Sequence, residues 1–321
     1  MLMYLRAGML EDIFGRKERR VKFVTSLLKE SSTYCLERVE YPSPLKTPYD
    51  ENNRAYAFHY IPKQGRRMLA VVKLHGLGVR TIRSEQFFYR ILLRSGFDAV
   101  LFVLPYHLER TPKGTRSGTY FFSLERERSF NAFRQAVLDL RCLADYLTGR
   151  GLSLGICGTS LGAILLNTLM GVDGRYEIGV SVSGGGNINR IVWEGLMGRF
   201  VKSFLKSRGV KEDHYLDMLE EFRSFLAEIR NRGEIPRPKW EWWLLDPLTF
   251  AHLNRPRRVL LFNGLFDLIV PRSCAQELSS ALGGVEICWL PASHFSIGLF
   301  APLIVRRSLR FLAKYGAKER I

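Results

Sequence analysis

The stretch from Leu152 to Met170, LSLGICGTSLGAILLNTLM, constrains the fold of this chain more than any other. Its first six residues are a short apolar run typical of a buried strand, and residues 163–170 have the composition of a helix. Between them lies Gly-Thr-Ser-Leu-Gly, a sharp turn with Ser160 at its apex. Such a turn leaves no room for a Cβ atom at either glycine and holds the serine strained, with its hydroxyl exposed. The alternative is an ordinary strand-to-helix turn that only needs small residues.

Apolar strands alternate with helical segments along most of the chain. Strands are predicted at residues 69–74, 97–104, 152–157, 176–182, 258–262 and 285–290, and helices at 84–95, 124–147, 163–170, 274–282 and 297–314. Residues 34–41 and 55–61 alternate in part, as antiparallel edge strands do. Strands that are apolar throughout and alternate with helices indicate a sheet covered on both faces. The predicted fold class is therefore α/β, with a doubly wound, mostly parallel sheet.

Two segments depart from this alternation within what we expect to be a single domain of residues 1–321. Residues 187–250 carry apolar side chains at helical spacing, which predicts a helical cap inserted into the domain. Residues 1–32 mix apolar and basic residues at helical spacing, which predicts an N-terminal helical extension. We expect that helix to pack on the domain rather than to lie on a membrane surface.

The chain is strongly basic, with 48 Lys and Arg against 31 Asp and Glu and a net charge of +17. Such a charge is typical of proteins that meet nucleic acid or anionic lipid. Here the basic residues are spread over the whole chain and mixed with acids, and no nucleic-acid-binding motif occurs. We therefore expect solvated basic faces and no nucleic-acid partner, and peripheral contact with a membrane is not favoured.

Cysteine usage and the absence of targeting signals point to the cytoplasm. The five cysteines are scattered, odd in number and without metal-ligand or disulfide spacing. No run of about 18 apolar residues occurs, and the first twenty residues do not have the pattern of a secretory signal. The sequence predicts a cytoplasmic protein with no metal and no cofactor.

Chemistry-bearing residues follow the predicted strands, where doubly wound sheets place their functional groups. The residues at these ends are His75, His107, Ser160, the glycines 184–186, Asp267 and His294. A hydroxyl needs a base to become a nucleophile, and the base needs a carboxylate to hold its tautomer. Ser160, Asp267 and His294 follow one another in the order that a nucleophile elbow and its two partners predict.

Four motifs, HGLG, GTSLG, NGLFDLIVP and PASHF, together resemble the α/β-hydrolase superfamily over residues 34–315. The resemblance implies that Ser160 is the nucleophile, His294 the general base and then acid, and Asp267 the carboxylate that orients the imidazole. It also implies an oxyanion hole formed by the backbone N–H groups of Leu77 and Leu161.

Other residues near these motifs have roles that the sequence leaves open. His75 is expected to be structural, and Gly76 lets its loop approach the serine closely. His107 either lines the pocket or supports the elbow. Gly185 either lets the backbone pass near the pocket or only makes a turn. The cap is expected to overhang Ser160, with three tryptophans that either pack the cap or wall an apolar pocket: Trp240, Trp242 and Trp243.

The function implied is that of a serine hydrolase, first of all a carboxylic-ester hydrolase that acts on small-molecule acyl esters through an acyl-enzyme. A serine peptidase or an acyl-thioesterase on the same fold is the second hypothesis. A non-catalytic binding or membrane-surface protein is the third, and an intact triad argues against it. The oligomeric state is left open.

Overall fold

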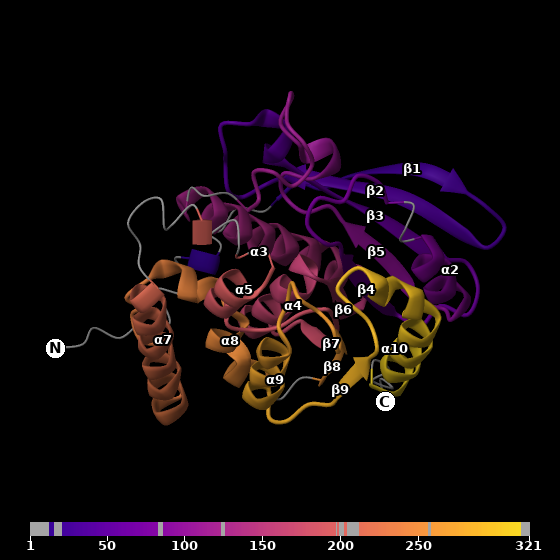
Figure 1. The fold of residues 1–321 in the computed structure, drawn as a ribbon. Helices are drawn as coiled ribbons and strands as arrows, with labels where there is room; N and C mark the ends of the chain where they lie inside the picture. The colour runs from indigo at the N-terminus through magenta and orange to yellow at the C-terminus, as the bar shows by residue number, and fades with distance from the viewer. Residues whose placement is uncertain are drawn as a thin grey trace.

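A nine-stranded sheet organises the computed structural model, which describes residues 13–15, 21–82, 86–122, 126–196, 198, 202–203, 212–255 and 258–315 (Figure 1). The strands are β1 (Val24–Glu30), β2 (Tyr34–Pro42), β3 (Arg54–Pro62), β4 (Leu69–Leu74), β5 (Asp98–Phe102), β6 (Ser153–Thr159), β7 (Tyr176–Val182), β8 (Arg258–Gly264) and β9 (Ile287–Leu290). Their order across the sheet is β1-β2-β3-β5-β4-β6-β7-β8-β9. All pairs from β5 to β9 are parallel, and the three pairs that join β1, β2, β3 and β5 are antiparallel. The prediction of a mostly parallel α/β sheet is confirmed.

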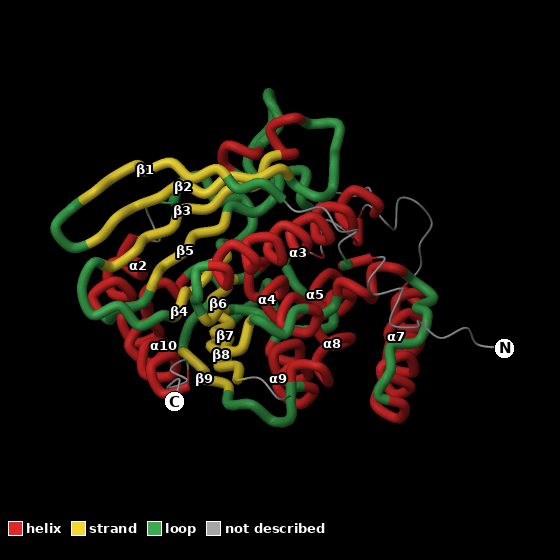
Figure 2. Tube along the Cα trace, turned by 180° about the vertical axis from the view of Figure 1, so that it is seen from behind, coloured by secondary structure: helices red, strands yellow, loops and turns green. Residues whose placement is uncertain are grey.

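Helices cover both faces of the sheet. They are α2 (Gln86–Arg94), α3 (Arg126–Gly149), α4 (Leu161–Val172), α5 (Ile188–Glu194), α7 (Glu212–Arg232), α8 (Pro247–Asn254), α9 (Arg272–Ala281) and α10 (Ala301–Tyr315), with short 3-10 helices η1 (Asp50–Asn53), η3 (Leu108–Arg110), η4 (Glu241–Leu245) and η5 (Ser296–Phe300). Side chains of α3, α4, α8 and α9 share one buried cluster, and side chains of α2 and α10 share the other. Figure 2 shows the two groups of helices on opposite sides of the parallel strands.

The alternation of side chains along a strand explains the two clusters. On β4, Ala70 and Val72 belong to the cluster beneath α3 and α4, whereas Leu69 and Val71 face α2 and α10. Both sets are buried, so the strand reads as apolar throughout. This double burial is the reason that the parallel strands could be predicted from the sequence.

Between β7 and β8 the described residues form α5, α7, η4 and α8. The cap at residues 187–250 stays a prediction. In both views the longest of these helices, α7, stands at the edge of the molecule, beyond α5 and α8 (Figures 1 and 2). The last helix, α8, belongs to the layer that covers the sheet. A Cβ atom on Gly171 of α4 would lie 2.3 Å from Cβ of Phe250, so these two helices are in close contact.

The predicted N-terminal helix is wrong for Val24–Glu30, which form strand β1. This strand pairs with β2 from Val24 to Glu30, and all seven of its side chains are exposed. The ladder of backbone hydrogen bonds therefore defines the segment, and its apolar spacing does not mark a buried helix face. Within the predicted helix, Phe14 is buried and packs on Phe250. Residues 1–12 and 16–20 lie outside the described residues.

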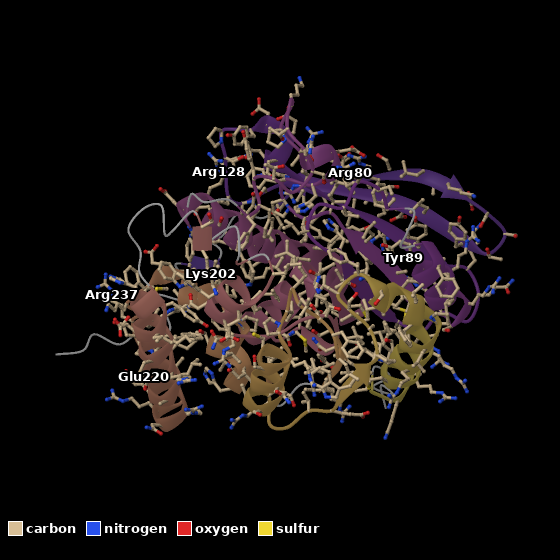
Figure 3. The ribbon with its side chains drawn as sticks, viewed as in Figure 1. Arg80, Tyr89, Arg128, Lys202, Glu220 and Arg237 are labelled. Carbon is tan, nitrogen blue, oxygen red and sulfur yellow. The ribbon has the colours of Figure 1, made fainter. Side chains whose placement is uncertain are left out.

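The positive charge is dispersed over the described surface. Figure 3 shows Arg80, Arg128 and Arg237 on well-separated parts of the molecule. Many cations are paired with acids, as in the ion pair between Arg307 and Glu286 at 3.0 Å. No helix of the described residues is both long and apolar enough to cross a membrane. All five cysteines are free thiols, four of them buried.

Candidate active site

Ser160 lies at the turn between β6 and α4 in a strained conformation, with φ 54° and ψ −117°. A non-glycine residue in such a region costs about 1–3 kcal/mol, so the surrounding structure must impose it. The two flanking glycines make the turn possible. A Cβ atom on Gly158 would lie 2.2 Å from the carbonyl oxygen of Gly162, and one on Gly162 would lie 2.5 Å from that of Leu74. Only glycine fits at either position.

The three residues predicted to act together meet at this turn. The Nε2 atom of His294 lies 2.9 Å from Oγ of Ser160, and its Nδ1 atom lies 2.8 Å from Oδ2 of Asp267. A carboxylate only accepts hydrogen bonds, so Nδ1 carries the hydrogen and Nε2 is left to accept from the serine hydroxyl. We call these three residues the triad. Their arrangement permits a serine to lose its proton to an oriented imidazole.

Asp267 is held in place from both of its oxygens. Its side chain is 1% exposed, and Oδ1 accepts the backbone N–H groups of Ile269 and Val270, each at 2.9 Å. Oδ2 is thereby turned toward His294. The predicted position Gly185 lies behind this loop, where a Cβ atom would come within 3.0 Å of Val270 Cγ1. Gly185 is thus a close-packing glycine between this loop and Cys274 of α9, whose Cβ would lie 2.9 Å away.

The two segments that carry the predicted oxyanion-hole donors, Leu77 and Leu161, lie beside the serine. A Cβ atom on Gly76 would be 3.6 Å from Cβ of Ser160, so the loop that carries Leu77 approaches the elbow closely. Leu161 is the first residue of α4, where backbone N–H groups have no partner within the helix. Among the described residues, neither the Leu77 nor the Leu161 amide has a hydrogen-bond acceptor.

Comparisons with known proteins bear on this fold. No model of a protein family matches the chain, and no curated protein matches its sequence. Solved structures do match. Acetyl xylan esterase 1 from a Thermoanaerobacterium species is 16% identical with a TM-score of 0.55, covering 95% of this chain and 92% of its own.

Two further structures are similar over nearly their whole length. A cold-adapted esterase from an Arctic intertidal metagenomic library is 13% identical, with a TM-score of 0.56 and coverage of 89% of this chain and 96% of its own. The Pyrococcus furiosus esterase Pf2001 is 14% identical, with a TM-score of 0.51 and coverage of 99% and 98%. This chain has the α/β-hydrolase fold. The turn that carries Ser160 directly follows β6, a parallel strand in the middle of the sheet.

Both ring nitrogens of His75 form hydrogen bonds with backbone groups. Its Nδ1–H donates to the carbonyl oxygen of Gly76 at 2.8 Å, and its Nε2 accepts the N–H of Leu104 at 3.2 Å. Burial, aided by the neighbouring His107 and Lys73, lowers the pKa of His75 to about 3. This imidazole is therefore neutral and joins two loops through its two ring nitrogens.

His107 holds the loop that carries the predicted oxyanion donor. Its Nδ1 lies 2.8 Å from the carbonyl oxygen of Pro105 and carries the hydrogen, so its Nε2 accepts the N–H of Gly78 at 3.0 Å. Burial, together with the nearby Arg110 guanidinium, lowers the pKa of His107 to about 4. Of the two roles that the sequence left open, the contacts favour support, and they place that support on the loop after His75.

A second contact from the same segment holds this loop. Ser117 Oγ donates to the carbonyl oxygen of Val79 at 2.6 Å. A Cβ atom on Gly118 would lie 2.7 Å both from Gly78 N and from His107 Nε2, and Gly118 has φ +82°. The segment from His107 to Gly118 therefore fits against residues 78–79 without room for a further side chain.

Two buried charges near the site were not found by sequence reasoning. Lys73 is 6% exposed, and its Nζ donates to Oγ1 of Thr159, the residue before the serine, at 2.6 Å. Arg110 is fully buried and pairs with Asp139 at 2.8 Å. A lysine within an otherwise apolar strand was the available signal for the first. The arginine had no local signal because its partner lies 29 residues away.

The three tryptophans of the predicted cap pack on their neighbours. Trp240 and Trp242 stack with ring centroids 4.9 Å apart, and Trp240 Nε1 donates to Glu221. Trp243 is buried against two phenylalanines of α7, Phe222 and Phe225. Of the two roles considered for these rings, the contacts favour packing of the cap.

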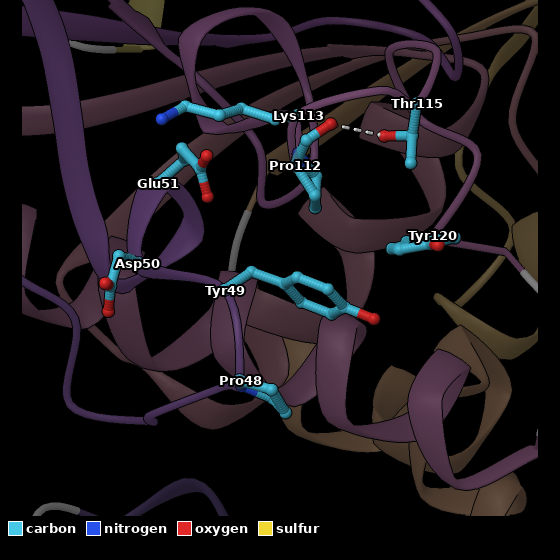
Figure 4. A pocket seen from close by; sticks show the side chains of 8 residues that line it. All are labelled: Pro48, Tyr49, Asp50, Glu51, Pro112, Lys113, Thr115 and Tyr120. Atoms are coloured by element: carbon cyan, nitrogen blue, oxygen red, sulfur yellow. Dashed lines mark hydrogen bonds between the residues drawn. The ribbon is translucent and has the colours of Figure 1, made fainter.

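Two surface cavities lie apart from the triad. One of about 440 Å³ is lined by Pro48, Tyr49, Asp50, Glu51, Pro112, Lys113, Thr115 and Tyr120 (Figure 4). Another of about 530 Å³ adjoins Arg80 and Ser117. Neither lining includes a triad residue. Among the described residues, no group of three or more His, Cys, Asp or Glu side chains could hold a metal ion.

Proposed function

We propose that this protein is a serine hydrolase that cleaves carboxylic esters through an acyl-enzyme on Ser160. The observation that carries the proposal is the hydrogen-bonded chain from Ser160 through His294 to Asp267, at 2.9 and 2.8 Å. The strained serine supports the same chemistry, as do the Leu77 and Leu161 amides, which have no hydrogen-bond acceptor among the described residues. Structures that share the fold include proteins named as esterases.

In the first step Ser160 Oγ attacks the ester carbonyl carbon while its proton passes to Nε2 of His294. Asp267 stabilises the imidazolium that forms. The carbonyl oxygen becomes negatively charged and accepts hydrogen bonds from the N–H groups of Leu77 and Leu161. The bond to the alcohol oxygen then breaks, and His294 gives its proton to the departing alcohol.

The second step reverses these roles with water. His294 removes a proton from a water molecule that attacks the acyl carbon, and the same two amides stabilise the second oxyanion. When the bond to Ser160 Oγ breaks, His294 returns the proton to the serine. One ester and one water thus give one acid and one alcohol.

A fluorophosphonate probe tests the proposal directly, because it reacts with an activated serine. The folded wild type should be labelled stoichiometrically, and Ser160→Ala should not be labelled. The exposed Ser32→Ala is the matched control and should be labelled like the wild type. A folded wild type that resists labelling would overturn the proposed function.

Three substrates that share one acyl group test whether the enzyme prefers esters, thioesters or amides. Acetyl esters, acetyl thioesters and acetyl anilides can all follow the two steps above, and they differ only in the leaving atom. We expect the ester to have the largest kcat/KM of the three. A larger value for the anilide or the thioester would replace the esterase by a peptidase-like enzyme or a thioesterase.

A further inference from the structure

Exposed apolar side chains are concentrated on the loops around the triad. Among the described residues fourteen large apolar side chains are exposed, and six of them belong to these loops or to segments bonded to them. They are Leu77, Leu196, Phe266, Leu268, Phe295 and Leu299, which we call the apolar rim. Single exposed apolar residues are ordinary, but a cluster of them is typical of a binding surface.

The rim is attached directly to two members of the triad. Phe266 and Leu268 flank Asp267 in sequence and are 64% and 67% exposed, whereas Asp267 itself is buried. Phe295 follows His294, and the two rings lie 5.8 Å apart. The loops that bury the carboxylate therefore present their apolar side chains to solvent next to the imidazole.

Backbone hydrogen bonds join the rim into one surface. The Phe266 N–H donates to the carbonyl oxygen of Ala292, two residues before His294, at 3.0 Å. The Leu196 N–H donates to the carbonyl oxygen of Leu268 at 2.6 Å, which brings the cap to the aspartate loop. These bonds hold the three segments next to one another, so the rim side chains that they carry lie close to the triad.

The position of the rim relative to His294 decides which part of an ester it faces. In the proposed mechanism His294 gives its proton to the departing alcohol, so the alcohol must lie against the imidazole. The carbonyl oxygen lies on the other side, at the amides of Leu77 and Leu161. Except for Leu77, every rim residue belongs to the histidine and aspartate loops or to segments continuous with or bonded to them.

We propose that the substrate carries an extended apolar group on its alcohol side, which lies across the apolar rim next to His294. This inference rests on the proposed function. It assigns the substrate class as esters of medium-chain or long-chain aliphatic alcohols, including lipid-like alcohols. Burial of each methylene of that chain on an open surface should raise kcat/KM about twofold, roughly half the logarithmic gain of full burial.

Two homologous ester series test the inference. Butyl, hexyl and octyl acetate vary the alcohol at constant acyl group, and methyl butyrate, hexanoate and octanoate vary the acyl chain at constant alcohol. The primary alcohols of the first series are equally good leaving groups, so their rates report binding alone. All are used below saturation, with acid release followed by pH-stat. From butyl to octyl acetate kcat/KM should rise about 16-fold, four methylenes at about twofold each.

Substitutions at the most exposed rim positions should flatten this rise. Phe295 and Leu299 are 82% and 81% exposed, so Phe295→Ser and Leu299→Ser remove no core contact. The double variant should show less than a fourfold rise across the alcohol series. Leu27→Ser on β1 and Leu216→Ser on α7 are matched controls, exposed to 60% and 58%. Both controls should keep the full 16-fold rise, and all variants should melt within about 2 °C of the wild type.

The outcomes separate this inference from the proposed function. If fluorophosphonate labels Ser160 but kcat/KM is flat across the alcohol series, or rises only with acyl length, the inference fails and the hydrolase remains. If the double variant keeps the 16-fold rise, the rim is not the surface that receives the alcohol. If no ester is cleaved and no labelling occurs, both are overturned.

Discussion

The two sides of the proposed site are held by different means. On the histidine side, Asp267 bonds the imidazole of His294 and two amides of its own loop, Ile269 and Val270. These partners of Asp267 lie in its own loop or in the segment that follows the neighbouring strand β9. The outer surface of this side is apolar.

On the oxyanion side, the loop after His75 depends on a separate segment of the chain. His107 bonds Gly78, and Ser117 bonds Val79, from positions 29 and 38 residues away. The same segment is anchored by Arg110, which is fully buried against Asp139 of α3. The histidine side is therefore built from short motifs that directly follow two neighbouring strands, and the oxyanion side from buried polar contacts made by the segment His107–Gly118.

The largest effect is expected on the histidine side. Asp267→Asn preserves the size of the side chain, but its amide can donate to His294 and so favours the wrong imidazole tautomer. We expect kcat for acetyl esters to fall about 10⁴-fold, with little change in melting temperature. Steady-state assays should show this loss, and exposed Asp217→Asn on α7 should behave as the wild type. A loss of less than tenfold would contradict a role for Asp267 in orienting the imidazole.

On the oxyanion side, the largest expected effect is a loss of folding stability. Arg110→Met leaves the carboxyl group of Asp139 buried without its cation, and such a loss typically costs about 3–5 kcal/mol of unfolding free energy. Urea denaturation at pH 7 measures this cost. Exposed Arg116→Met is the matched control and should change stability by less than about 0.5 kcal/mol. Adding Asp139→Asn to Arg110→Met should restore part of the loss, and its failure to do so would place the cost elsewhere.

The difference between the two sides also explains what could be predicted from the sequence. Ser160, Asp267 and His294 each sit in a short motif that directly follows a strand, and parallel strands bring such motifs to one edge of the sheet. The strands themselves could be predicted because β4 and its neighbours are buried on both faces and are therefore apolar throughout. Local chain order was therefore enough to bring the three residues together.

The hydrogen-bond partners of His107 and of β1 could not be predicted. The role of His107 depends on its bond to Gly78, and nothing in the residues around His107 indicates that partner. Likewise β1 is a strand because its backbone pairs with β2, although Val24, Leu27 and Leu28 are spaced as on one face of a helix. In both cases a hydrogen bond to another segment decides the structure, and the spacing of residues along the chain does not indicate that bond.

A more selective variant of the oxyanion side is His107→Phe. It keeps a ring in the buried site but removes the acceptor for the Gly78 N–H, so the neighbouring Leu77 amide loses its fixed position. We expect kcat to fall about 10- to 100-fold with KM changed less than threefold, because the oxyanion forms only in the transition state. His107→Gln offers an acceptor again and should recover part of kcat. Equal losses in kcat for the two variants would indicate a packing role alone.

Acid should lower folding stability by less than Arg110→Met does, because the two histidines of the oxyanion side are buried in the neutral form. Burial lowers the pKa of His107 to about 4 and that of His75 to about 3, below the ordinary value near 6.5. Below pH 6.5 the unfolded chain binds protons that the folded protein does not, so stability is full above that pH and falls as pH falls toward 4. For His107 this amounts to about 2 kcal/mol between pH 7 and 4.5.

The histidine that titrates can be identified by comparing variants. Urea denaturation at pH 7 and 4.5 should show a loss of stability about 2 kcal/mol smaller in His107→Gln than in the wild type, because glutamine binds no proton. Exposed His214→Gln on α7 should leave the wild-type loss unchanged. If His107→Gln loses as much stability as the wild type, its imidazole is not held neutral, and the bond from Gly78 to Nε2 is not what fixes the loop. The distinction between the two sides would then rest on Arg110 and Ser117 alone.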